Sequence, residues 1–441
     1  MLPWNALKPQ RVMRLDRLRF SARGGVRAAA LPAAGLSSSG LPAGARRSLL
    51  AIPDFRRLWL VGLVVFSVRW LEMIVVGVFV YRHTGSAFTV ALMTMLRMLP
   101  MALFGALIGA LAERLERRSA LIAVVLAMLA TSASLAALAY AGRLAVWHLA
   151  LASFVNGIAW AADNPVRRVM IGDVVGHERM GAAMSVDVGA NNASRMLGPT
   201  IGGLLLAGAG ISGAFTVSVL CYAIALGVAL RVRHRSRPAP IAAGVLARMI
   251  EGFVLVRRDP KLIATLVVTV IYNVFGWPLT AMVPVIGQDS LHLGASGIGI
   301  LASMDGVGAF CGALVIALFA KPAHYARLYI GGVAVYLVML IVFALVPIVP
   351  LAGAALLCTG VSNAGFSVMQ ATLIYLSAPA EMRSRLYGVL SVCIGVGPLG
   401  FLYLGVLADT IGAPRATALS GVLGLLALAM TRRWWRQLGA A

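Results

Sequence analysis

Long apolar segments recur along this chain of 441 residues, from Leu58 almost to its end. Each is long enough for a helix to cross a hydrocarbon layer of about 30 Å, which takes roughly 20 residues. Helices are the expected element, because in lipid a helix satisfies its own backbone hydrogen bonds. With 60% hydrophobic and only 12% charged residues, the chain has too little polar surface for a soluble domain. The sequence therefore predicts an all-α protein embedded in a membrane.

The order of apolar segments and helix breakers predicts twelve transmembrane helices in two bundles of six. A basic cytosolic tail (1–57) precedes the first bundle (58–230), and a short cytosolic tail (432–441) follows the second (262–431). The connecting segment between the bundles (231–261) opens with alternating arginines and continues as an amphipathic helix at the cytosolic surface. The twelve helices are expected at 58–81, 88–111, 120–141, 147–169, 182–207, 211–230, 262–287, 297–319, 327–347, 351–376, 388–409 and 414–431.

The formal net charge of +23 raises the question of a nucleic-acid partner. The basic residues instead follow the order of the loops. With the N-terminal tail in the cytosol, the cytosolic segments hold about 25 of them and the opposite loops about three. A nucleic-acid surface would need them together on a folded domain outside the helices. We therefore expect the lipid bilayer as a partner and no nucleic acid, with both termini cytoplasmic and the chain in a bacterial inner (plasma) membrane.

Patterns typical of enzymes and metal sites are missing from the sequence. The four cysteines lie inside apolar segments without metal-ligand spacing, and the six histidines lie at helix ends or in loops. Neither a Walker loop nor a nucleophile elbow is present. We expect no enzyme activity, no cofactor and no metal.

The two halves carry the same landmarks: a glycine, then a glutamate 21 residues later, then a Gly-Pro pair in the fifth helix of each half. The landmarks are Gly157, Glu178 and Gly198-Pro199 in the first half, and Gly360, Glu381 and Gly397-Pro398 in the second. Six helices separate the copies, so the repeat is parallel. In transporters built from such repeats, substrate binds between the halves near the membrane midplane.

The loop after the second helix reads Gly109-Ala110-Leu111-Ala112-Glu113-Arg114-Leu115-Glu116-Arg117-Arg118. It resembles the signature loop of the major facilitator superfamily, although that family usually has Asp and Gly where this chain has Glu113 and Glu116. The resemblance implies the two-bundle fold. It also implies that Glu113 caps a neighbouring helix and latches the cytosolic gate, with the basic partners Arg114, Arg117 and Arg118. The alternative is that these basic residues only set the topology.

The fifth helix carries a second motif made of Gly198, Pro199, Gly202 and Gly203. Proline bends a helix, and glycines let a facing helix approach closely. The motif resembles the one found in exporters of this superfamily that exchange substrate for protons, and the alternative is ordinary small-residue packing. Over residues 55–431 the chain resembles the branch of enterobactin exporters and macrolide-efflux proteins, for example at Phe55-Arg56-Arg57-Leu58-Trp59.

Ionisable residues inside the apolar segments are the best site candidates, because each costs about 2.5–3.5 kcal/mol at a helix centre unless it is paired or hydrated. Glu72 is expected to carry a coupled proton. The alternative is that Glu72 neutralises a nearby arginine in a structural network. The surplus of arginines in the first half favours an anionic or multiply oxygenated amphiphile. The candidates for proton coupling or the substrate cavity are Arg69, Glu72, Arg97, Asp187, Arg195 and Asp305.

From the resemblance we expect a monomeric secondary transporter. It would export a small-molecule substrate, such as a siderophore or an antibiotic, in exchange for protons by alternating access. Two alternatives stay open: a transporter-like sensor or scaffold, and an importer of the same fold.

The topology can be tested in the connecting segment. A reporter fused after Arg237 should be active only in its cytosolic form, because basic residues hold that segment on the cytosolic side. Paired fusions to alkaline phosphatase and green fluorescent protein measure this directly. Phosphatase activity at this position would contradict the predicted topology.

Overall fold

The computed structural model describes residues 49–114, 116–235, 253–257, 259–377 and 382–439. Within these ranges the chain is almost entirely helical and forms no strand. The longer helices are α2 (Pro53–Thr84), α3 (Ala87–Arg114), α4 (Arg117–Tyr140), α5 (Val146–Val175), α6 (Met180–Leu230), α8 (Pro260–Ile271), α9 (Leu279–Asp289), α10 (Ala295–Phe319), α11 (Tyr325–Leu345), α12 (Val349–Ser377), α13 (Arg383–Ile394), α14 (Gly397–Ile411) and α15 (Ala413–Met430). The short elements are η1 (His177–Arg179), the π-helical turn η2 (Tyr272–Gly276), η3 (Pro322–His324), α16 (Arg432–Trp435) and η5 (Arg436–Gly439).

Ten helical segments in the described ranges are long and apolar enough to cross a membrane. One of them, α6, consists of two helices that meet at Gly210, whose φ of 67° breaks the helical course. The 30-residue helix α5 is a further segment of membrane-spanning length. With α6 divided and α5 included, the described helices are consistent with twelve crossings. The predicted all-α membrane fold is confirmed.

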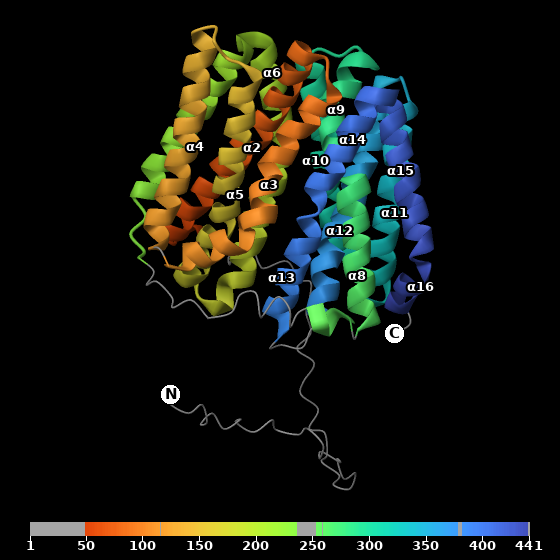
Figure 1. Cartoon of the computed structure of the whole chain (residues 1–441). Coiled ribbons are helices and arrows are strands. Elements are labelled where there is room, and N and C mark those ends of the chain that lie inside the picture. The colour runs from red at the N-terminus through yellow and green to blue at the C-terminus, as the bar shows by residue number, and fades with distance from the viewer. Residues whose placement is uncertain (1–48, 115, 236–252, 258, 378–381, 440–441) are drawn as a thin grey trace, which may run out of the picture. The chain divides into compact units, whose positions relative to one another are not determined.

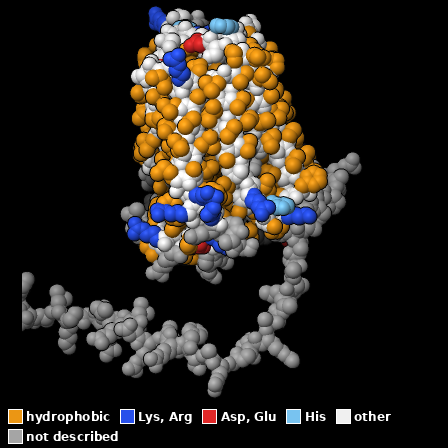
Figure 2. All heavy atoms as spheres, turned by 90° about the vertical axis from the view of Figure 1, so that its right-hand side faces the viewer, with side chains coloured by type: hydrophobic (Ala, Val, Ile, Leu, Met, Phe, Trp, Pro, Cys, Tyr) orange, Lys and Arg blue, Asp and Glu red, His pale blue; other side chains and the backbone are white. Residues whose placement is uncertain are grey.

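Figure 1 shows the helices in two groups, α2–α6 in the first half of the chain and α8–α16 in the second. Figure 2 shows apolar side chains covering the side of the second group, while Lys and Arg gather at the end where the C-terminus lies. A surface of this kind is stable against hydrocarbon and not against water. We call the end near the C-terminus the tail end.

Contacts between the groups close the opposite end, which we call the sealed end. Tyr81 of α2 donates its hydroxyl hydrogen bond to the Asp289 carboxylate of α9. Asp409 of α14 accepts hydrogen bonds from the Ser86 hydroxyl at 2.6 Å and from the Phe88 backbone N–H at 3.0 Å. Asp409 thus caps the first turn of α3 from the other half of the molecule.

Glycines bring α6 and α10 together without side chains between their backbones. A Cβ atom on Gly203 would lie 2.4 Å from the carbonyl oxygen of Ala295, and one on Gly299 would lie 2.4 Å from that of Pro199. Gly202 packs in the same way on the other side of α6, where its Cβ would lie 2.7 Å from the carbonyl oxygen of Leu71 in α2. The fifth-helix motif therefore packs α6 closely against α2 and α10.

The parallel repeat has matching contacts in the two halves. A Cβ on Gly157 of α5 would lie 2.3 Å from the backbone oxygen of Arg97 in α3. The equivalent Gly360 of α12 would place a Cβ 2.0 Å from the backbone oxygen of Asp305 in α10. Each landmark glycine thus fixes the backbone of a helix that carries a charged residue into the middle of the molecule.

The α6–α10 contact can be tested with one methyl group. Gly203→Ala should lower the thermal stability, since overpacking at a close backbone contact costs about 1–3 kcal/mol. Gly208→Ala is a matched control on the same helix, because its Cβ would meet nothing within 4 Å, so it should keep or raise stability. Thermal unfolding of both proteins in detergent measures the difference. Equal stability of the two variants would contradict the close contact.

Candidate functional site

A cavity of about 370 Å³ lies between the two groups of helices, about midway along them. The first half contributes side chains from α2, α3, α5 and α6, and the second half contributes η2, α9, α12 and α13. Apolar and aromatic side chains form much of the wall, among them Trp70, Met98, Met101, Trp160 and Trp277. A cavity of this kind, with few polar groups on a largely apolar wall, is typical of small-molecule sites.

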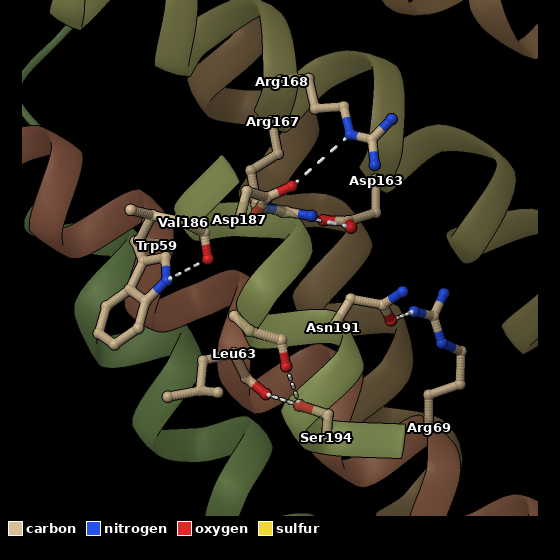
Figure 3. A network of polar contacts seen from close by, with 11 residues as sticks. Trp59, Leu63, Arg69, Asp163, Arg167, Arg168, Val186, Asp187, Asn191 and Ser194 are labelled. Carbon is tan, nitrogen blue, oxygen red and sulfur yellow. Dashed lines mark hydrogen bonds and ion pairs between the residues drawn. The ribbon is translucent and has the colours of Figure 1, made fainter. Parts of the chain in front are cut away.

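Arg69 of α2 reaches this cavity, where two aromatic rings hold its guanidinium group. The group lies over the rings of Phe66 and Trp160, at 4.8 Å from each ring centroid. Its Nη2 donates to Oδ1 of Asn191 in α6 at 3.2 Å, as Figure 3 shows. Its Nη1 is buried and has no hydrogen-bond partner. Arg69 is therefore held in place while one of its N–H groups still lacks a hydrogen-bond acceptor.

Arg97 of α3 lies beside Arg69 on the cavity wall. Its Nη1 donates to the backbone oxygen of Arg69 at 3.4 Å, and its buried Nε has no partner. Among the described side chains, no carboxylate lies within 4.0 Å of either guanidinium group. The structure thus brings together two of the predicted site residues as cations without a carboxylate at ion-pair distance.

Glu72 points away from the cavity into the first group of helices. Only 2% of its surface is exposed, and it accepts hydrogen bonds from the Ser132 hydroxyl at 2.7 Å and from Nδ2 of Asn156 at 3.5 Å. Within the described part of the chain it makes no ion pair with Arg69, Arg97 or Arg195. The idea that Glu72 neutralises one of these arginines by direct contact finds no support, and its role as proton carrier stays a prediction.

Arg195 of α6 and Asp305 of α10 form an ion pair that joins the two halves. Thr359 donates to the other carboxylate oxygen of Asp305 at 3.5 Å. The Asn363 amide lies between Arg195 and the Tyr272 hydroxyl, and in the orientation that satisfies both, its oxygen accepts from Arg195 while its nitrogen lies 2.8 Å from Tyr272. Unlike Arg69 and Arg97, Arg195 has a counter-ion.

Asp187 belongs to a separate buried cluster and does not line the cavity. Arg167 of α5 is fully buried and pairs with Asp187 of α6 and, at 3.3 Å, with Asp163. Arg168, which is half exposed, lies 3.6 Å from Asp187, and Figure 3 shows the four side chains together. The position of Gly62 leaves room for Arg167, because a Cβ there would lie 2.5 Å from its Nη1. The cluster joins α2, α5 and α6 into one unit.

The structure describes the side chains of only part of the gate motif. Gly109, Glu113 and Arg114 lie outside the residues whose side chains the structure describes, so the latch on Glu113 stays a prediction. Arg117 pairs with Asp173 of α5 at 2.7 Å, and Arg118 donates to the backbone oxygen of Leu230 at 2.9 Å. Both contacts lie within the first half of the chain.

Several residues at these sites escaped the sequence analysis. Arg167 lies in α5, four residues after Asp163, and this spacing was the sequence signal for their ion pair. Helix α5 also runs further than predicted, to Val175 instead of 169. Asp289 and Asp409 contact residues more than 200 positions away, which no local pattern reveals. In the ranges that the structure describes, no three His, Cys, Asp or Glu side chains come close enough to hold a metal ion.

Known proteins resemble this chain in sequence and in fold. It matches the transmembrane secretion effector family over residues 47–437. Macrolide efflux protein A of Streptococcus pyogenes is 24% identical over 346 residues, which are 77% of this chain and 85% of that protein. The staphyloferrin A transporter of Staphylococcus aureus is 24% identical over 377 residues, which are 81% and 90% of the two chains. These matches confirm the predicted resemblance to efflux proteins of the major facilitator superfamily.

Solved transporter structures share the fold. A bacterial homolog of the human lysosomal transporter Spinster, in an inward-facing and unoccupied conformation, has a TM-score of 0.70 at 17% identity and covers 90% of this chain and 98% of its own. The nucleoside transporter NupG has a TM-score of 0.70 at 11% identity, with 87% and 99% covered. At such identities the likeness concerns the fold alone.

The buried cluster predicts unequal effects of two neighbouring arginines. Arg167→Met should leave Asp163 and Asp187 buried without their main counter-ion, which costs about 3–5 kcal/mol. Arg168→Met removes a half-exposed charge and should cost less than about 1 kcal/mol. Membrane yield and thermal unfolding in detergent measure both. An Arg167→Met protein as stable as Arg168→Met would show that the cluster does not hold these helices together.

Proposed function

Because the chain belongs to the transmembrane secretion effector family, we propose that it is a secondary active transporter. It exports a small amphiphilic molecule, such as an antibiotic or a siderophore, across a bacterial plasma membrane. The observation that carries this proposal is the cavity between the halves, lined from both sides and closed toward the sealed end. Rocking the halves about such a cavity exposes it to the two sides of a membrane in turn.

The distribution of charge supports the orientation of the molecule in the membrane. Lys and Arg gather at the tail end (Figure 2), which the positive-inside rule places in the cytosol. The sealed end is then the outer end, and the cavity takes up its cargo from the cytosol or the inner leaflet. The names of two relatives, macrolide efflux protein A and staphyloferrin A transporter, agree with small-molecule transport.

The proton gradient is the proposed energy source, and Glu72 is the proposed carrier. A buried carboxylate without an ion pair can exist in a neutral and an ionised form, and a change of its surroundings shifts the balance between them. Asp187 suits this role less well, because Arg167 and Arg168 both neutralise it. Asp305 is the second candidate, since its pairing with Arg195 spans the two halves that must move.

Transport can be tested with purified protein in proteoliposomes. A panel of macrolides and siderophores is supplied on the cytosolic side, and flux is followed with and without an imposed pH gradient. Gradient-driven movement toward the outer side supports proton-coupled export. Movement only toward the cytosolic side supports an importer, and the absence of flux for a folded protein supports a sensor or scaffold.

Glu72→Gln tests the carrier within this assay. The amide keeps the size of the side chain, and its oxygen can still accept from the Ser132 hydroxyl. Its NH2 group can donate to Asn156 once that amide turns its unused oxygen toward it, but it cannot release a proton. We expect gradient-driven flux to fall at least about tenfold, with little change in melting temperature, because no ion pair is lost. Glu178→Gln makes the same chemical change at an exposed position and should transport normally. Full gradient-driven flux in Glu72→Gln would exclude Glu72 as the carrier.

A further inference from the structure

We propose that Arg69 and Arg97 form an anion-binding half-site in the cavity, and that the transported molecule carries a carboxylate that binds there. This inference rests on the proposed function, because it takes the cavity as the site of transport. It names the chemistry of the cargo on the basis of the charges and hydrogen-bond donors that the cavity leaves unsatisfied.

Among the described residues, some arginines in the apolar layer have carboxylate partners, and the two at the proposed half-site do not. Arg167 is neutralised by Asp163 and Asp187, and Arg195 by Asp305. Arg69, of which 9% is exposed, and Arg97 have no carboxylate within ion-pair distance in the described part of the chain. An unpaired cation at the middle of an apolar layer is costly unless water or an anion compensates it. These two positions therefore hold positive charge ready for a ligand.

Aromatic and amide side chains hold Arg69 in place next to the structural cluster. Phe66 is almost fully buried, and its ring lies 4.8 Å from the guanidinium carbon of Arg69 and 4.7 Å from that of Arg167. The ring thus contacts both the neutralised arginine and the unpaired one. Trp160 and Asn191 hold the same guanidinium group from other sides. Arg69 is preorganised for a ligand, so it loses little conformational freedom on binding.

The unsatisfied polar atoms around the cavity are mostly donors. Arg69 Nη1, Arg97 Nε, Trp70 Nε1 and Trp160 Nε1 are buried N–H groups without a partner on side chains that line it. On the opposite wall, the Asn363 amide donates to the Tyr272 hydroxyl, and its oxygen accepts from Arg195. Unused donors beside two guanidinium groups favour a ligand rich in acceptor oxygens, and a planar carboxylate matches the guanidinium fork.

The remaining wall fits the apolar body of such a molecule. Met98 and Met101 of α3 and Trp277 near α9 present thioether and indole groups to the cavity. Flexible methionines adapt to ligands of different shape. The cavity thus suits an amphiphile with its carboxylate on the arginines and its apolar part against α3 and α9. Because the cytosol is electrically negative, the membrane potential itself favours the outward movement of such an anion.

The test uses two fluorescent probes that differ only in charge. Dansylglycine carries a carboxylate, and dansylglycinamide carries a neutral amide in the same place. Energy transfer from the three cavity tryptophans, Trp70, Trp160 and Trp277, to the dansyl group reports binding to the purified full-length protein. We expect dansylglycine to bind at least about tenfold more tightly than dansylglycinamide, because only the carboxylate gains charge-assisted hydrogen bonds.

Arg69→Gln and Arg97→Gln should each reduce this preference to about threefold or less, while Arg143→Gln in an exposed loop should keep it. The melting temperature separates a binding role from a structural one. Losing an unpaired charge should leave it unchanged or raised, so a marked loss of stability in both variants would contradict the proposal. Equal binding of the two probes, or an unchanged preference in both variants, would also overturn it.

These outcomes are independent of transport. If the protein prefers the carboxylate probe but transports none of the molecules tested, the anion site is supported and the proposed export is contradicted. If the protein exports uncharged or cationic molecules and binds the two probes equally, export is supported and the anion site is contradicted.

Discussion

The ion pair between Arg195 of α6 and Asp305 of α10 joins the two halves of the molecule within the apolar layer. A charged side chain at this depth needs a counter-charge, because the surrounding hydrocarbon does not solvate ions. The buried arginines differ in how far this need is met. Arg167 is neutralised within one half, Arg195 is neutralised across the halves, and Arg69 and Arg97 stay without a carboxylate at the cavity. The first arrangement builds a rigid half, the second ties the halves together, and the third is open to a ligand.

Glycine packing decides where the halves touch. Gly203 and Gly299 bring the backbones of α6 and α10 into contact, and the Thr200 hydroxyl and backbone N–H both donate to Ser303 beside them. At the sealed end, hydrogen bonds to Asp289 and Asp409 add further contacts between the halves. Such bonds can break and form again at modest cost, because water takes their place at the membrane surface. In the proposed alternating access, the hydrogen bonds to these carboxylates are the part that opens.

Much of the fold could be predicted from the sequence, because apolar length and helix breakers are local signals. The helix expected at 262–287 is observed as α8 and α9 joined by the π-helical turn η2, and the repeated Gly157 and Gly360 occupy matching contacts. The candidate site was harder to predict. Arg69, Arg97, Arg195 and Asp305 were identified from their depth alone, but their pairing depends on contacts between helices that are far apart in the chain. From the sequence alone, Arg195 counts among the surplus arginines of the first half, whereas the structure pairs it with Asp305.

The central claim is that the two halves rock about a cavity that is closed at the sealed end. Spin labels at Arg82 and Thr410 report the distance across the sealed end, and labels at Arg56 and Leu376 report it across the tail end; all four positions are exposed. Asp409→Asn weakens the cap on α3, so it should shift molecules toward a state open at the sealed end. In double electron–electron resonance, the first distance should lengthen and the second should shorten in the same fraction of molecules. A longer distance at the sealed end with no change at the tail end would show local fraying of the helix ends and would contradict alternating access.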